Sequence, residues 1–130
     1  MTLPTRNIAA AALAGVWINL SEFLRNELLL KAYWLDHYRS LGLSFPSEPV
    51  NGAVWGVWGM LFGALIFWIS RRFDLRQTIA IGWLGGFVLM WLTLGNLHVL
   101  PAGLLLFALP LSLLEVSVAA LICRKLAPPR

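Results

Sequence analysis

The chain has 130 residues, of which 59% are hydrophobic and 12% are charged, and its net charge is +4. Soluble domains are nearer to about 45–50% apolar and about 25% charged, and a chain of this length has no interior that would hold the excess apolar surface. The composition therefore excludes an ordinary soluble domain and indicates an integral membrane protein. The basic residues lie between apolar segments instead of forming one surface, which argues against nucleic-acid binding.

Four apolar segments are long enough to cross a membrane, and we expect a single transmembrane domain over residues 1–130, an all-α four-helix bundle. The first helix begins near Pro4 or Thr5, and we expect it to be retained rather than cleaved as a signal peptide. No glycine or proline interrupts residues 16–40, so this helix is expected to continue into an amphipathic extension at the membrane surface. The predicted spans are residues 7–30, 50–70, 77–94 and 100–123, with the extension at residues 31–40.

Helix-breaking and helix-capping residues mark where the later spans begin and end. Residues 42–49 contain a glycine and two prolines and are predicted to form a loop. Asp74 and Gln77 have the spacing of a capping box, and Gly95-Asn96 provides a helix stop. Pro110 lies inside the fourth span and is expected to kink it.

The basic residues are distributed unevenly between the two sides. Lys31 and Arg39 fall on one side, and Arg25 lies within the first span or near its edge. The others fall on the opposite side: Arg6, Arg71, Arg72, Arg76, Arg124, Lys125 and Arg130. The positive-inside rule therefore predicts that both termini are cytoplasmic. A three-span arrangement is the alternative, and it would separate the basic pairs at residues 71–72 and 124–125.

Glycines share one face of the second span. Gly52, Gly56, Gly59 and Gly63 are separated by four, three and four residues. The third span adds Gly82, Gly85 and Gly86. Small residues let helix backbones approach closely in a membrane, so the simplest expectation is a tight contact between the second and third spans. Homodimerisation or docking to another protein is the alternative use of the same residues.

Ionisable and amide side chains lie inside the first span. Asn19, Glu22 and Asn26 share one helix face, which should point into the bundle. Arg25 is three residues from Glu22 and is expected to pair with it. Glu27 and Lys31 have the i, i+4 spacing of an ion pair and are expected at the outer interface.

Glu115 is an isolated acid in the fourth span. Counting about 1.5 Å per residue places Glu115 closest in height to Asn19, and it places Ser112 near Glu22. Arg25 would have to reach about 13 Å inward to meet Glu115, so the expected partner of Glu115 is Asn19. Because charge in hydrocarbon is costly, three roles stay open for these acids: a structural pair, a transport or proton pathway, and a contact with another subunit.

The sequence contains no motif for catalysis. It lacks HExxH, GxSxG, P-loop and CxxC patterns, so we expect no enzyme and assign no catalytic residue or cofactor. His98 lies in a predicted hairpin, where an ordinary loop histidine is favoured over a metal or tetrapyrrole ligand. Cys123 is the single cysteine, and a plain helix-end role is favoured over palmitoylation.

The layout resembles that of small uncharacterised four-span bacterial membrane proteins. The resemblance rests on Asn19, on the sequence WGVWG at residues 55–59 and on LEVSVAA at residues 114–120. It implies a bacterial cytoplasmic (inner) membrane and no particular activity. We expect the chain to act among membrane lipids by helix–helix association, as a homo-oligomer or as a subunit or accessory component of a membrane complex. The alternative is a small oligomeric transporter or channel with a polar path, lined by Asn19, Glu22, Asn26, Ser112 and Glu115.

Overall fold

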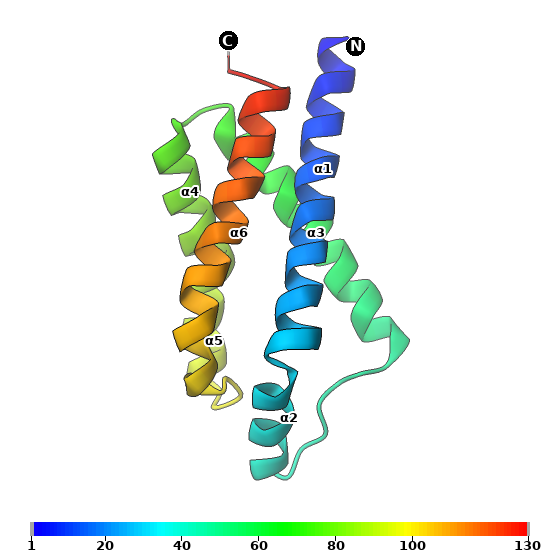
Figure 1. The fold of residues 1–130 in the computed structure, drawn as a ribbon, viewed down its shortest axis with the longest axis vertical. Coiled ribbons are helices and arrows are strands. Elements are labelled where there is room, and N and C mark those ends of the chain that lie inside the picture. The colour runs from blue at the N-terminus through cyan, green and yellow to red at the C-terminus, as the bar shows by residue number, and fades with distance from the viewer. Residues whose placement is uncertain (1, 130) are drawn as a thin grey trace.

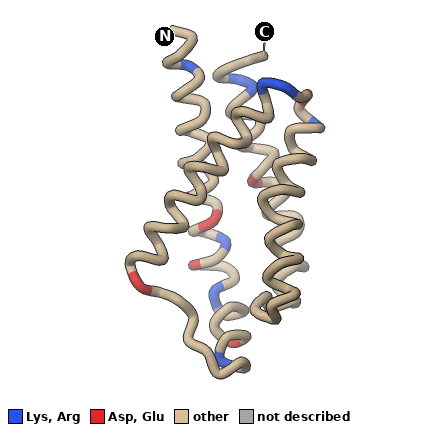
Figure 2. The backbone as a smooth tube through the Cα atoms, turned by 180° about the vertical axis from the view of Figure 1, so that it is seen from behind, with Lys and Arg blue, Asp and Glu red and all other residues tan. Residues whose placement is uncertain are grey.

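The computed structural model describes residues 2–129, and these residues are almost entirely helical and contain no strand. Four helical segments are long and apolar enough to cross a membrane: Leu3–Leu29, Pro49–Ser70, Leu75–Asn96 and Ala102–Leu126. The predicted all-α architecture with four candidate spans is therefore confirmed. Both chain ends lie at the same end of the bundle (Figure 1), and several basic residues gather there (Figure 2). Arg130 lies outside the described residues.

The first span changes its helical geometry near its end. It consists of α1 (Leu3–Phe23) and a π-helical turn (Leu24–Leu29), and α2 (Lys31–Ser40) follows. The expected uninterrupted helix over residues 16–40 is wrong, because Leu30 leaves helical geometry at φ −115° and ψ 9°. The Leu30 amide donates to the Arg25 carbonyl, five residues back, at 2.8 Å. This wide turn separates the membrane span from α2.

The remaining spans begin and end at local signals. In the third span, the side chain of Asp74 accepts from the Gln77 amide at 2.8 Å, which forms the predicted capping box. The second span begins with a further capping box between Glu48 and Asn51. A short 3₁₀ turn precedes the last helix, which continues through Pro110. The elements are α3 (Pro49–Ser70), α4 (Leu75–Trp83), a second π-helical turn (Leu84–Val88), α5 (Leu89–Asn96), the 3₁₀ turn (Ala102–Leu104) and α6 (Leu105–Leu126).

The backbones of α1 and α3 approach each other closely. A methyl group added to Gly63 would collide with the backbone of Gly15, and one added to Gly59 would collide with the side chain of Asn19. The glycine face of α3 therefore packs on the first span, which corrects the expected contact with the third. The physical reason is that two glycines facing each other let the backbones of α1 and α3 touch directly.

The other glycines divide into packed and open positions. In the third span, Gly86 faces the ring of Phe62 on the bulky side of α3, and Gly82 faces Val116 of α6 and Ile66 of α3. A methyl group on the three remaining predicted packing residues would meet no atom within 4 Å: Gly52, Gly56 and Gly85.

Arginine side chains join three spans at the end that holds the termini. The Nε of Arg6 donates to the Leu126 carbonyl at 2.9 Å. The Nη1 of Arg71 donates to the carbonyls of Ala127 at 3.0 Å and Pro128 at 2.7 Å. The last carbonyls of a helix lack intrahelical partners, so these arginines satisfy the end of α6 and tie α1 and α3 to it.

We expect Gly63→Ala to destabilise the fold by about 1–3 kcal/mol, because the new methyl group meets the backbone of Gly15, which cannot move aside. Reversible unfolding in mixed micelles measures this change. The matched control is Gly85→Ala, where the same methyl group enters open space. Equal losses of stability in the two variants would contradict the close α1–α3 contact.

Candidate functional site: a buried charged cluster

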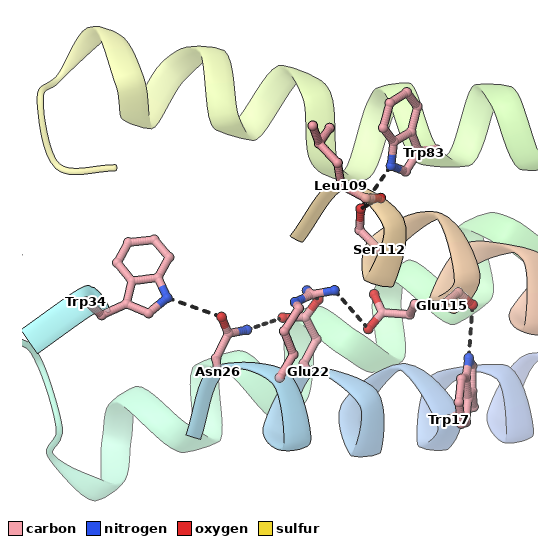
Figure 3. A network of polar contacts seen from close by, with 9 residues as sticks. Trp17, Glu22, Asn26, Trp34, Trp83, Leu109, Ser112 and Glu115 are labelled. Atoms are coloured by element: carbon pink, nitrogen blue, oxygen red, sulfur yellow. Dashed lines mark hydrogen bonds and ion pairs between the residues drawn. The ribbon is translucent and has the colours of Figure 1, made fainter. Parts of the chain in front are cut away.

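Three ionisable side chains from α1, its π-helical turn and α6 meet inside the bundle (Figure 3). The Nη2 of Arg25 donates to Oε1 of Glu22. The Nη1 of the same guanidinium lies 3.8 Å from Oε1 of Glu115. Glu115 is 0% exposed and Arg25 is 5% exposed, so two carboxyl groups share one cation away from solvent. We call Glu22, Arg25 and Glu115 the charged cluster.

A chain of hydrogen bonds connects the charged cluster to α2. Nδ2 of Asn26 donates to Oε2 of Glu22 at 2.8 Å, and Nε1 of Trp34 donates to Oδ1 of Asn26 at 3.2 Å. Glu22 therefore accepts from a guanidinium on one oxygen and from an amide on the other. Figure 3 shows this chain running from Trp34 toward Glu115. This chain of hydrogen bonds ends on α2, which lies at the end of the bundle opposite the termini (Figure 1).

The two π-helical turns within residues 2–129 both lie at the charged cluster. The first turn contains Arg25 and Asn26. The second contains Phe87, which is fully buried and whose ring centroid lies 5.1 Å from the Arg25 guanidinium carbon. A cation over an aromatic face is attracted by the ring quadrupole, and π-helical turns often occur at functional sites. The backbone departs from regular α-helix in both spans where they contact the arginine.

The charged cluster is incompletely hydrogen-bonded. Within the described chain, Nη1 of Arg25 and both carboxyl oxygens of Glu115 are buried without a hydrogen-bond partner. The 3.8 Å separation between the two groups is an ion-pair distance and too long for a hydrogen bond. Buried polar groups are nearly always paired in stable proteins, so a buried carboxyl with neither oxygen bonded marks this position as a candidate for function.

The structure corrects the expected partners of Glu115. Nδ2 of Asn19 donates to the Gly56 carbonyl of α3 at 3.1 Å, so Asn19 does not pair with Glu115. The expectation that Arg25 is too distant from Glu115 is also wrong. The height estimate used backbone positions alone. Side chains lean toward the N-terminus of their own helix, and α1 and α6 run in opposite directions, so Arg25 and Glu115 lean toward each other (Figure 1).

Ser112 forms its hydrogen bonds outside the charged cluster. Its Oγ accepts from Nε1 of Trp83 at 3.0 Å and donates to the Leu109 carbonyl at 3.0 Å. Of the six residues predicted to form a polar interior, four therefore form one connected group, and Asn19 and Ser112 bind backbone or indole groups of neighbouring helices. The connected group comprises Glu22, Arg25, Asn26 and Glu115.

The outlying polar residues have local partners. Nζ of Lys31 donates to Glu27 at 2.8 Å in the expected exposed pair. His98 has a positive φ of 60°, and its carbonyl lies 2.7 Å from Nε2 of His37. Among residues 2–129, no group of three or more His, Cys, Asp or Glu side chains is arranged to hold a metal ion. Cys123 is fully buried in the core.

Aromatic residues support the site in a way that the sequence interpretation missed. Nε1 of Trp17 donates to the Glu115 carbonyl at 2.9 Å, which fixes the height of α6 against α1. Trp34, Trp83 and Phe87 contact Asn26, Ser112 and Arg25. A signal was present for the tryptophans, because an indole N–H inside a membrane span needs an acceptor. Nothing in the sequence distinguished Phe87 from the other phenylalanines.

A scan against protein-family models, a search of curated proteins and a search of solved structures gave no match for this chain. The side chains described above are therefore the basis for proposing its function. Their arrangement can hold charge inside the bundle and can accept or release a proton, since it contains two carboxyl groups and one cation.

We expect Arg25→Gln to lower the free energy of unfolding by about 3 kcal/mol, because removing one partner of a buried ion pair leaves uncompensated charge. Reversible unfolding in mixed micelles gives the value. The control is Lys31→Gln, which breaks the exposed pair with Glu27 and should cost about 0.5 kcal/mol or less. A cost at Arg25 no larger than that at Lys31 would contradict a buried, stabilising pair.

Proposed function

We propose that this chain is an integral membrane protein that acts by helix–helix association, as a homo-oligomer or as a subunit or accessory component of a membrane complex. One observation carries the proposal: the glycine face of α3 is only half used within the chain. Gly59 and Gly63 pack against α1, whereas a methyl group on Gly52 or Gly56 would meet open space. Gly59 and Gly63 thus make a contact within the chain, and Gly52 and Gly56 offer the same pattern of small residues to a helix outside it.

The open half of the glycine face follows from the course of α3. The helix crosses α1 obliquely, so its N-terminal half diverges from the rest of the bundle (Figure 1). Exposed valine or leucine in a membrane needs no explanation, since lipid covers it. Glycine differs, because it costs about 1 kcal/mol relative to alanine in a helix and offers lipid no side chain. Its established advantage in a membrane helix is close approach by another backbone.

The proposal includes an orientation and a membrane. Six basic residues lie near the chain ends, in the turn between α3 and α4, or in the first turn of α4, on the side that holds both chain ends: Arg6, Arg71, Arg72, Arg76, Arg124 and Lys125. By the positive-inside rule this side is cytoplasmic. We place the protein in a bacterial cytoplasmic membrane, in keeping with the layout that it resembles.

Substituting leucine for Gly52 should disrupt association without unfolding the chain. The expected result after mild-detergent extraction is a larger particle for the native chain and a smaller one for Gly52→Leu, measured by light scattering during size exclusion. Val54→Leu is the matched control, since Val54 is exposed on the same helix and does not belong to the glycine face. A native chain that runs as a single small species with no co-purifying protein would count against association.

A small transporter or channel is the second candidate, and the charged cluster is the observation that favours it. The polar path is shorter than expected, because Asn19 and Ser112 are engaged elsewhere. It leads inward through Asn26 and Glu22 to Glu115. Toward the termini, fully buried apolar residues follow, including Ile18, Val116 and Cys123. Transport would therefore need an opening of this apolar layer.

For that second candidate, we expect proton or ion flux into reconstituted vesicles to fall at least about tenfold in the double variant Glu22→Gln with Glu115→Gln. The reason is that these two carboxyl groups are the ionisable acids of the path. Glu27→Gln, at the exposed pair with Lys31, is the control and should leave the flux unchanged. Flux that survives in the double variant would exclude a path through the charged cluster.

A further inference from the structure

The charges inside the charged cluster do not balance when both carboxyl groups are ionised. Glu22 and Glu115 would then carry two negative charges, and Arg25 supplies one positive charge. Arginine stays protonated in proteins, so it cannot adjust. A net charge left inside a low-dielectric bundle is unfavourable, and two carboxylates at one site repel each other. The group that can adjust is a carboxyl group, by binding a proton.

The hydrogen bonds distinguish the two carboxyl groups. Glu22 accepts from Arg25 on one oxygen and from Asn26 on the other, which suits an ionised carboxylate. Glu115 has no hydrogen bond on either oxygen and is 0% exposed. The same guanidinium is in contact with Glu22 and 3.8 Å from Glu115. The arginine thus compensates Glu22 fully and Glu115 poorly.

We infer that Glu22 and Glu115 form a buried proton-binding site that holds one proton at neutral pH, carried by Glu115 while Arg25 pairs with Glu22. The ligand of this site is a single proton, and the site is complete within one chain, so it does not depend on association with a partner. The two carboxyl groups therefore share one arginine.

Among residues 2–129, Arg25 is the only basic residue within ion-pair distance of Glu115. From the first span, its polar neighbours are Ser21, Glu22 and Arg25. From the third span, Phe87 covers the guanidinium and the Trp83 indole is engaged with Ser112. The Trp17 indole donates to the backbone carbonyl of Glu115 and leaves its carboxyl group free.

Glu22 is the less buried of the two carboxyl groups. Its side chain is 13% exposed, whereas that of Glu115 is 0% exposed. Asn26 and Trp34 extend the polar contacts from Glu22 to α2. On the other side of Glu115 the core is apolar, with Ile18 and Ala119 fully buried. The polar contacts of the site therefore lead toward the α2 end of the bundle, and its other side is closed by apolar residues.

Carbon-13 NMR of the full chain in lipid nanodiscs tests this site directly. The sequence contains four glutamates, so side-chain carboxyl labelling of glutamate gives four assignable signals. At pH 7, we expect the Glu115 signal at the protonated position. Glu115→Gln, which mimics the protonated group, should remove that signal and leave the others in place. A carboxylate signal for Glu115 at pH 7 would overturn the inference.

A second variant tests whether Glu22 and Glu115 share Arg25. In Glu22→Gln, Arg25 is free to pair with Glu115, so the Glu115 signal should move to the carboxylate position at the same pH. Glu27→Gln is the matched control and should leave Glu115 protonated. If Glu115 stays protonated in a folded Glu22→Gln chain, the two carboxyl groups do not share the arginine, and the inference is wrong. If that variant does not fold, the native spectrum at pH 7 still decides the protonation state.

Discussion

The interior of this bundle is organised around one guanidinium that cannot lose its charge. Arg25 is 5% exposed, and its neighbours are the groups that a buried cation requires: a carboxylate, a second carboxyl group and an aromatic face. The backbone also departs from regular α-helix at this site. The first span widens into a π-helical turn at Arg25, and the third span does so at Phe87. The polar interior is thus a consequence of placing an arginine inside an apolar span.

Packing around this centre relies on shape, since water supplies no driving force between helices in a membrane. The backbones of α1 and α3 touch at Gly15 and Gly63, and the bulky side of α3 packs on the third span through Phe62 and Phe87. The glycine face of α3 lets the backbone of α1 come close, whereas its bulky face holds the third span farther away. This asymmetry accounts for the oblique course of α3 and for the way its first half leaves the bundle (Figure 1).

Local features of this fold could be predicted from the sequence, and contacts between spans could not. The four apolar segments, the capping box of Asp74 and Gln77 and the bounds of α2 follow from neighbouring residues. The Glu22–Arg25 contact follows from helical spacing. The approach of Arg25 to Glu115 depends on side-chain direction in antiparallel helices, and the partner of Asn19 depends on how α3 crosses α1. The π-helical turns have no sequence signature that we could use.

The arginine contacts at the terminal end have a mechanical consequence for α3. Arg71 fixes the last turn of this helix to the end of α6. Within residues 2–129, no hydrogen bond joins residues 49–55 to another span, and the first such bond is at Gly56. The hydrogen bonds that hold α3 to other segments therefore all lie from Gly56 onward, and the first is made by Asn19, one helical turn from Glu22 in α1.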